Sequence, residues 1–250
     1  MRWLISRIRF VAVIASMAFM VLAIILIAPF SLKIIRKYVR MAWSRMLIAS
    51  TGAKLQIKGY PLNNEELKNA MLVSNHISWL DTVVMLRLCF VRYIGKIEML
   101  NWPILKTVIK AGGTIFIHRR KKKDILNVNQ QVAKYLTTGS TIGLYPEGKT
   151  GDGKVIAPFK APILEAALLA DSKIFPVVLS YRKEDDQLAT EVTFAKVNWL
   201  QTVMNTIKLK DLTINVTILP PINARDFSSR DLLADHLYQL ISNEYFKSAP

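Results

Sequence analysis

The sequence predicts an α/β fold in which a mixed, largely parallel sheet is flanked by helices. From residue 54 onward, short apolar runs alternate with longer segments that have helical periodicity. Strands separated by helices pair in parallel, through right-handed crossovers. The later apolar runs alternate more strictly between apolar and polar residues, which predicts an antiparallel or edge portion of the sheet.

The N-terminus predicts an uncleaved membrane anchor. Residues 10–28 carry no charge, and at 1.5 Å per residue a helix of this length approaches the ~30 Å hydrocarbon core of a bilayer. A secretory signal is the alternative, but its apolar region would be shorter. Pro29-Phe30 also follows where small residues should mark cleavage.

Residues 31–50 predict a basic amphipathic helix that suits anionic lipid headgroups. The alternative is a helix that packs its apolar face on the folded domain. Cations flank the anchor on both sides, and their greater number after it favours a cytoplasmic domain at a bacterial-type inner membrane. A hairpin that enters and leaves on one face would satisfy both flanks. The cations after the anchor are Lys33, Arg36, Lys37, Arg40 and Arg45.

Composition predicts two parts, an anchor region at residues 1–50 and a single α/β domain at residues 51–250. The 250 residues, of which 52% are apolar, suit one domain of ordinary size with an additional segment. The net charge of +16 would also suit a nucleic-acid partner. However, aromatic residues are not interleaved among the cations to stack on bases. Membrane lipid, an acidic carrier protein or a phosphorylated substrate accounts for the charge as well.

The predicted elements follow in order along the chain. Strands are expected at residues 54–58, 71–73, 92–97, 114–117, 141–145, 174–181, 191–197 and 212–219. Helices are expected at residues 82–90, 100–111, 124–136, 162–170 and 231–245, with Gly139 ending the third of these. A cluster of glycines after residue 147 lacks the spacing of a nucleotide-binding P-loop, and a flexible turn is its other interpretation.

The predicted turn between the strand at 71–73 and the helix at 82–90 holds a histidine and an aspartate, His76 and Asp81. An imidazole takes up a proton near neutral pH, and a carboxylate can fix its tautomer. On a regular helix, five residues turn the chain by roughly 140°, so the two can pair only if His76 lies in the turn and Asp81 in the first helical turn. The alternative is a capping pattern formed by Ser78 and Asp81.

The remaining reactive side chains predict neither a metal site nor a disulfide. The three histidines and the single cysteine are too dispersed in the sequence for a recognisable ligand set. Cys89 falls in the apolar helix after the turn, where we expect a small buried side chain rather than a nucleophile. His236 is expected to be solvated on the last helix.

Four sequence blocks together resemble one family. Asn75-His76, with Asp81 five residues after the histidine, resembles the N-H-x-x-x-x-D signature of the glycerolipid acyltransferases, specifically the lysophosphatidate acyltransferase family. Three more blocks follow in that family's order, between residues 113 and 178. They are Gly113-Thr114-Ile115-Phe116-Ile117-His118-Arg119, Tyr145-Pro146-Glu147-Gly148 and Phe175-Pro176-Val177-Val178.

The resemblance implies that a fatty acyl group passes from acyl-CoA or acyl carrier protein to the free hydroxyl of a lysophospholipid. The most specific expectation is 1-acylglycerol-3-phosphate as acceptor, giving phosphatidic acid, with no cofactor. His76 would be the general base, oriented by Asp81. The anionic head of the acceptor would meet Arg119 with the Glu147-Gly148 turn, and Lys96 is a further candidate.

Two departures from the family's pattern leave the acceptor open. Lys149-Thr150 follows Gly148 where the family commonly has Thr followed by Arg or Ser, and Phe159-Lys160-Ala161-Pro162 lacks the usual glycine. Residues 147–160 are similar to the lyso-ornithine lipid acyltransferases, so that acceptor is the closest alternative. A phospholipid hydrolase and a non-catalytic lipid-binding membrane protein are alternatives of other classes, and the intact His76 and Asp81 argue against the second.

Overall fold

The computed structural model describes residues 2–27, 33–101, 109, 113–117, 122–193 and 197–247. Within these residues one sheet of eight strands runs in the order β1-β7-β6-β2-β5-β3-β4, with β8 beside β6. The strands are β1 (Lys54–Gly59), β2 (Ala70–Ser74), β3 (Arg92–Lys96), β4 (Ile115–Ile117), β5 (Thr141–Leu144), β6 (Lys173–Arg182), β7 (Thr213–Ile218) and β8 (Ile222–Asn223).

The sheet is mixed and largely parallel, which confirms the predicted fold class. The run β6-β2-β5-β3-β4 is parallel throughout, whereas β7 and β8 both pair with β6 in the antiparallel sense. Every residue of β2 is buried and β6 is buried from its second residue on. Continuous burial explains their unbroken apolar runs, because helices cover both faces of a parallel sheet.

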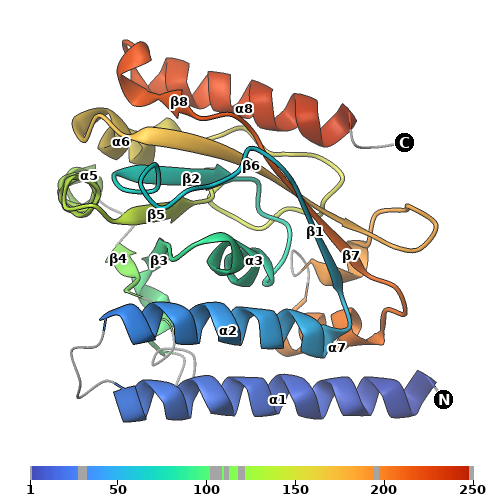
Figure 1. Cartoon of the computed structure of the whole chain (residues 1–250). Helices are drawn as coiled ribbons and strands as arrows, with labels where there is room; N and C mark the ends of the chain where they lie inside the picture. The colour runs from blue at the N-terminus through green and yellow to red at the C-terminus, as the bar shows by residue number, and fades with distance from the viewer. Residues whose placement is uncertain are drawn as a thin grey trace.

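Helices lie on both sides of this sheet (Figure 1). On one side are α5 (Lys122–Thr137), α6 (Glu165–Leu169) and α8 (Arg230–Lys247), and on the other α1 (Arg2–Ile27), α2 (Lys33–Thr51), α3 (Asp81–Leu88) and α7 (Trp199–Lys208). Short 3-10 turns are η1 (Ile97–Asn101), η2 (Ala161–Leu164), η3 (Thr190–Val192) and η4 (Ala224–Asp226). Gly139 ends α5 in the left-handed conformation, as predicted, and its N–H binds the carbonyl of Leu136.

Two expectations differ from the structure. The strand predicted at residues 191–197 is wrong for its described part, because residues 190–192 close into the turn η3 and Thr193 forms only an isolated bridge with Ser78. The helix predicted at 162–170 is divided into η2 and α6. The helix predicted at 100–111 lies mostly outside the described residues. The sequence interpretation also missed α7, although the Asn198 side chain caps it by accepting from the Gln201 N–H.

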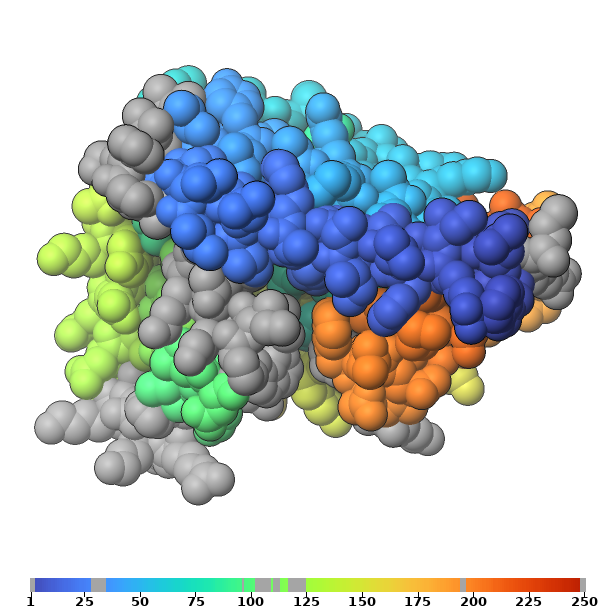
Figure 2. All heavy atoms as spheres, turned by 90° about the horizontal axis from the view of Figure 1, so that it is seen from below, coloured from blue at the N-terminus to red at the C-terminus, as the bar shows by residue number. Residues whose placement is uncertain are grey.

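The helices α1 and α2 lie side by side below the domain (Figures 1 and 2). One stripe of α1, formed by Val13, Ser16 and Met20, is almost fully buried. The indole of Trp43 on α2 donates to the Ser16 carbonyl at 3.1 Å. Residues 3–27 are long and apolar enough to cross a membrane by length and composition. Much of the apolar surface on the outer face of α1 is exposed.

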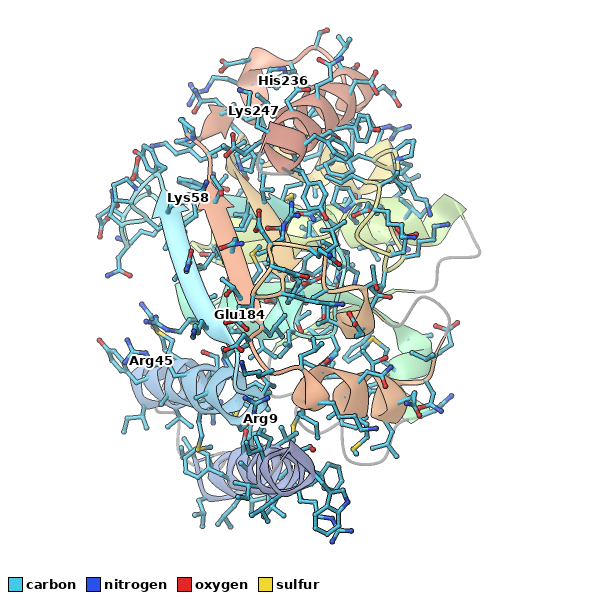
Figure 3. All side chains as sticks on the ribbon, turned by 90° about the vertical axis from the view of Figure 1, so that its right-hand side faces the viewer. Arg9, Arg45, Lys58, Glu184, His236 and Lys247 are labelled. Carbon is cyan, nitrogen blue, oxygen red and sulfur yellow. The ribbon has the colours of Figure 1, made fainter. Side chains whose placement is uncertain are left out.

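Arg9 fixes α1 to the end of another helix. Its guanidinium donates to the carbonyls of Ile207, Leu209 and Lys210, at 3.1, 2.5 and 3.4 Å. These carbonyls lie at and just after the C-terminus of α7, where backbone acceptors lack helical partners and a cation is favoured. Gly52 has φ of 77°, which favours glycine, and a Cβ there would lie 2.2 Å from this guanidinium, which would have to move. Figure 3 labels Arg9 between α1 and the rest of the domain.

The apolar face of α2 packs on the domain, as the alternative interpretation of residues 31–50 expected. Trp43, Leu47 and Ile48 are buried in the same core as the sheet. The helix contacts α3, which begins at Asp81. A stack of three helices therefore connects the outer apolar face of α1 to the turn that holds His76.

Candidate active site

Three parallel neighbours, β6, β2 and β5, have their carboxyl ends at one edge of the sheet. The turn with His76 follows β2, and the turn with Glu147 follows β5. Loops at the carboxyl ends of parallel strands are where α/β folds place ligand sites. Two of the sequence blocks, about seventy residues apart, therefore meet in space.

Asn75 connects the end of β2 to β6. Its side chain is fully buried, its amide donates to the Leu179 carbonyl, and its oxygen accepts from the Leu179 N–H, both at 2.8 Å. This pair of bonds satisfies both backbone groups of one residue. The first residue of the motif thus sets the position of the turn.

His76 and Asp81 form a close pair. The imidazole Nδ1 lies 2.7 Å from Asp81 Oδ2, with His76 in the turn and Asp81 at the first position of α3. This is the arrangement that the five-residue spacing requires. A carboxylate facing Nδ1 places the proton on that nitrogen and leaves Nε2 able to accept one. The imidazole is 18% exposed, whereas the Asp81 side chain is completely buried.

Asp81 also binds backbone N–H groups just before α3, as the capping interpretation expected in part. Its Oδ2 accepts from the backbone N–H groups of Ile77 and Ser78, at 2.6 and 2.9 Å. Ser78 is not the N-cap of α3, which is Leu80 and has no side-chain cap bond. One carboxylate oxygen therefore orders the backbone of the turn and contacts the imidazole.

A tyrosine that the sequence interpretation missed holds the other oxygen of Asp81. The Tyr181 hydroxyl donates to Asp81 Oδ1 at 2.5 Å, from β6. Burial, and then the charge of Asp81, raise the pKa of Tyr181 well above its ordinary value. The signal in the sequence was a tyrosine inside a strand that reads as fully buried, because a buried phenol usually needs a partner.

The plane of the imidazole is set by a second missed tyrosine. The ring of Tyr145 stacks on His76 at 4.3 Å between centroids, with 17° between the planes. Tyr93 stacks in turn on Tyr145, and its hydroxyl donates to the Thr82 carbonyl at 2.6 Å. A Cβ at Gly143 would come within 2.8 Å of the Tyr93 ring, so a glycine in β5 makes room for it.

Glu147 is directed to the backbone of this turn. Its Oε1 accepts from the His76 N–H at 2.7 Å, and its Oε2 accepts from the Ala157 N–H at 3.0 Å. The side chain is buried, and burial raises its pKa above the ordinary value. Gly151 N–H donates to the His76 carbonyl at 2.7 Å. The glycine-containing loop therefore binds both backbone groups of His76, which a merely flexible turn would not do.

Comparison with known proteins relates this chain to one family. Residues 57–180 match the acyltransferase family. This segment, which carries His76 and Asp81, is an acyltransferase-family domain. It is 29% identical over 177 residues to a 1-acyl-sn-glycerol-3-phosphate acyltransferase of Neisseria gonorrhoeae, covering 71% of this chain and 69% of that one. It is 26% identical over 191 residues to a lyso-ornithine lipid O-acyltransferase of Pseudomonas aeruginosa, covering 76% and 72%.

The fold of this acyltransferase is also found in a solved structure. The crystal structure of the 1-acyl-sn-glycerophosphate (LPA) acyltransferase PlsC from Thermotoga maritima matches it with a TM-score of 0.74 and 16% identity. The match covers 99% of this chain and 97% of that one. The chain therefore has a PlsC-like fold. The family match and the named relatives identify it as an O-acyltransferase, and its apolar N-terminal helix accords with membrane association.

The cations expected at the acceptor head are only partly placed in this acyltransferase. Arg119 and the side chain of Lys96 lie outside the described residues, although the backbone of Lys96 pairs with Ile117. Gly148 has φ of 73°, and a Cβ there would lie 2.9 Å from the ammonium of Lys160. The positive φ favours glycine at this position, and Lys160 is a cation beside the Glu147 turn that the sequence interpretation did not assign.

The cysteine of this acyltransferase is a buried side chain, as the sequence predicts. Cys89 is buried, and burial raises the pKa of its thiol to about 12. Among the described residues, no group of three or more His, Cys, Asp or Glu side chains could hold a metal ion. His236 is half-buried on α8, where its ring lies 5.1 Å from that of Phe227, so it is less solvated than expected.

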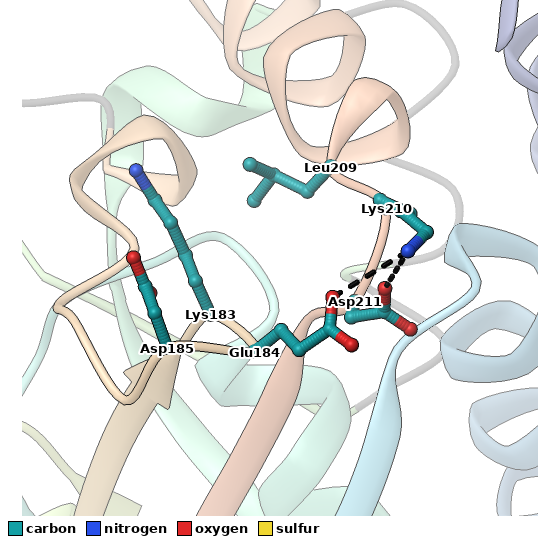
Figure 4. Close-up of a pocket in the computed structure, with 6 residues that line it drawn as sticks. All are labelled: Lys183, Glu184, Asp185, Leu209, Lys210 and Asp211. Atoms are coloured by element: carbon teal, nitrogen blue, oxygen red, sulfur yellow. Dashed lines mark hydrogen bonds and ion pairs between the residues drawn. The ribbon is translucent and has the colours of Figure 1, made fainter.

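A separate surface pocket of about 420 Å³ lies between the loop after β6 and the segment before β7 (Figure 4). Its lining includes Lys210, which pairs with Glu184 at 3.5 Å and with Asp211 at 3.4 Å. None of the residues that line it belongs to the His76 site. Lys183, also in the lining, pairs with Glu191 outside the pocket at 2.6 Å. We assign the pocket no role.

Proposed function

We propose that the protein transfers a fatty acyl group from a thioester to the free hydroxyl of a lysolipid, with 1-acylglycerol-3-phosphate as the first candidate and phosphatidic acid as its product. The pairing of a partly exposed His76 with a fully buried Asp81 carries the proposal. The names of the similar Neisseria and Thermotoga proteins support this acceptor.

In the proposed reaction, His76 Nε2 takes the proton of the acceptor hydroxyl as its oxygen attacks the thioester carbonyl. The oxygen–carbon bond forms, the carbon–sulfur bond breaks, and the proton passes from the imidazolium to the departing thiolate. Asp81 stabilises the imidazolium and holds the tautomer. Cys89 is buried and protonated, so the acyl group moves directly to the acceptor. Backbone N–H groups would stabilise the oxyanion.

We propose that cations near the Glu147 turn bind the anionic head of the acceptor. The family resemblance assigns this role to Arg119, whose guanidinium can bind two phosphate oxygens at once. The ammonium of Lys160 above Gly148 adds a described cation at the same turn. Both oxygens of Glu147 are occupied by backbone N–H groups, so Glu147 contributes by shaping this turn.

A lyso-ornithine lipid is the second candidate acceptor. One observation favours it, namely the Pseudomonas lyso-ornithine lipid O-acyltransferase, which aligns with a larger share of this chain than the Neisseria protein does. The departures at Lys149 and at Ala161-Pro162 lie beside the turn proposed to bind the head. A head without a phosphate would require different contacts there.

We further propose that residues 1–50 attach the domain to the cytoplasmic face of a bacterial-type inner membrane. The outer face of α1 exposes large apolar side chains, among them Val11, Ile14, Leu22 and Leu26. An exposed apolar face of this size marks a membrane or protein contact, and the cations of α2 suit anionic headgroups beside it. Acyl-CoA or acyl carrier protein would then supply the acyl group from the cytoplasm.

An acyl-transfer assay of the purified protein, with a panel of lysolipids and both donors, tests the proposal. We expect diacyl product, formed fastest with 1-acylglycerol-3-phosphate. Faster acylation of lyso-ornithine lipid would select the second candidate. Free fatty acid without diacyl product would indicate a hydrolase, and binding of lysolipids without turnover would indicate a non-catalytic lipid-binding protein.

A further inference from the structure

The Tyr181 hydroxyl has no part in the proposed proton transfer, yet it contacts the pair that performs it. Tyr181 lies on β6 and is 1% exposed. Its hydroxyl donates to Asp81 Oδ1 at 2.5 Å, across 100 residues of sequence. It belongs to none of the four sequence blocks that resemble the family.

The two oxygens of Asp81 have different partners. Oδ2 is in contact with three nitrogens, those of the His76 ring and of the Ile77 and Ser78 backbone. Among the described residues, the donor to Oδ1 is Tyr181. A completely buried carboxylate oxygen needs a donor, since leaving it without one is costly in free energy.

This arrangement fixes the rotation of the carboxylate. The N–H groups of Ile77 and Ser78 hold Oδ2 alone, so without a bond to Oδ1 the carboxylate group can still tilt about Oδ2 and change its alignment with the imidazole. With the bond, Oδ2 stays in line with His76 Nδ1. The raised pKa of Tyr181 keeps the phenol protonated, so it remains a donor.

We propose that Tyr181 is a positioning residue for acyl transfer, which acts through Asp81 to hold the His76 imidazole in its reactive tautomer and orientation. The inference rests on the proposed role of His76 as general base. The contacts that run from the Tyr181 hydroxyl through Asp81 to His76 Nδ1 do not depend on which substrate is bound.

The test is Tyr181→Phe, which removes the hydroxyl and keeps the ring. We expect kcat to fall about 10- to 100-fold, the range for loss of one hydrogen bond to a charged group. The KM values for donor and acceptor should stay unchanged, because Tyr181 touches neither. Tyr60→Phe is the matched control, since Tyr60 donates to the Glu66 carboxylate at 2.9 Å and should be silent in kcat.

A double-mutant cycle separates positioning from a general effect on the fold. In an Asp81→Asn background, Tyr181→Phe should reduce kcat no further, since its route to His76 is already broken. An equal loss in both backgrounds would show that Tyr181 acts elsewhere and would overturn the inference. Wild-type kcat in folded Tyr181→Phe protein would overturn it as well.

Two unnatural side chains keep the inference testable if Tyr181→Phe fails to fold. 4-Aminophenylalanine at position 181 keeps a donor at the same place and should retain kcat to within about tenfold. 4-Methylphenylalanine fills the same volume without a donor and should lose activity. Folded but inactive 4-aminophenylalanine protein, or equal activity of the two, would contradict the proposal.

Failure of the inference is distinguishable from failure of the proposed function. If His76→Ala is inactive and Tyr181→Phe is fully active, the general base stands and the positioning role falls. If His76→Ala retains normal turnover, the proposed mechanism itself is wrong. The His76→Ala assay is therefore run beside the Tyr181 series.

Discussion

The Glu147 carboxylate accepts a hydrogen bond of 2.7 Å from the backbone N–H of His76, 71 residues earlier in the chain. The bond joins the turn after β5 to the turn after β2. Its second oxygen binds the Ala157 N–H, which closes the loop that carries Gly148, Gly151 and Gly153. The carboxylate that the sequence interpretation placed at the acceptor head is thus bonded to the backbone around the proposed base.

Glu147→Gln should lower stability and kcat together. A glutamine offers one oxygen and one N–H₂ group to two backbone donors, so one buried N–H loses its partner at about 1–3 kcal/mol. Urea unfolding and steady-state kinetics measure the two effects. The control is Glu165→Gln, at a half-exposed ion pair with Arg230. A large rise in acceptor KM with unchanged stability would instead show direct contact with substrate.

His76→Ala should abolish acyl transfer without loss of folding, since the imidazole is the proposed base. Asp81→Asn should be nearly as damaging, because an amide cannot accept from His76, Ile77 and Ser78 in the same way. General-base contributions are typically ~10²- to 10⁴-fold in rate. Initial rates, with circular dichroism as the folding check, provide the measurement. Near-normal turnover in His76→Ala would refute the mechanism.

Asn75→Ala should lower the stability of the protein as well as its rate of acyl transfer. The change removes the partners of the Leu179 N–H and C=O groups, which are buried beside the end of β2. The loss should cost roughly 1–3 kcal/mol of stability for each group. The midpoint of urea unfolding should shift to lower concentration. Asn64→Ala, in an exposed turn where its oxygen accepts from Lys37, is the control. Unchanged stability with lost activity would point to a contact between Asn75 and substrate.

Cys89 should be unreactive in the folded protein and dispensable for activity. The pKa of its thiol is raised from 9.0 to about 12, so between these pH values the unfolded chain loses a proton that the folded chain keeps. Its contribution to stability is thus present below pH 9 and is lost as the pH rises toward 12. Alkylation at pH 8 should need denaturant, and Cys89→Ala should retain turnover. An inactive, folded variant would indicate a covalent intermediate.

Negative charges introduced by substitution on the outer face of α1 should release the protein from vesicles. Ile14→Glu with Leu22→Glu changes two side chains that are about half exposed, so folding should be preserved. Co-sedimentation with anionic vesicles is the measurement. Leu232→Glu, equally exposed on α8 across the sheet, is the matched control and should still bind (Figure 1). Unchanged binding of the double variant would place the membrane contact elsewhere.

Most elements of the fold could be predicted from local pattern. The strand and helix on each side of His76, the glycine that ends α5 and the antiparallel late strands all follow from periodicity and turn residues. The segment around Val192 misled because its alternation resembles a strand. It lies outside the sheet, and its backbone bonds locally, from the Val192 N–H to the Ala189 carbonyl. The pattern of one segment does not show whether another strand lies beside it to form the backbone pairs of a sheet.

The candidate site could be predicted only where its residues are close in sequence. His76 and Asp81 share one turn, so spacing and helix geometry were enough to state when they meet. Tyr181 and Tyr145 reach the same pair from β6 and β5, and their positions depend on strand order, which spacing does not fix. Glu147 was identified as a site residue, but its direction toward the backbone depends on the path of a loop.

The strand order has a consequence for the timing of activity during synthesis. β1 pairs with β7, and β2 with β6, so the sheet around the site joins segments that leave the ribosome at very different times. Contacts of such long range form late, because the intervening chain must first be closed into a loop. A nascent chain that ends before residue 173 already contains His76 and Asp81, yet it lacks the Leu179 backbone that binds Asn75 and the hydroxyl of Tyr181. We expect such chains to carry the apolar helix α1 and to have no acyl-transfer activity, so the proposed attachment to a membrane would come before activity.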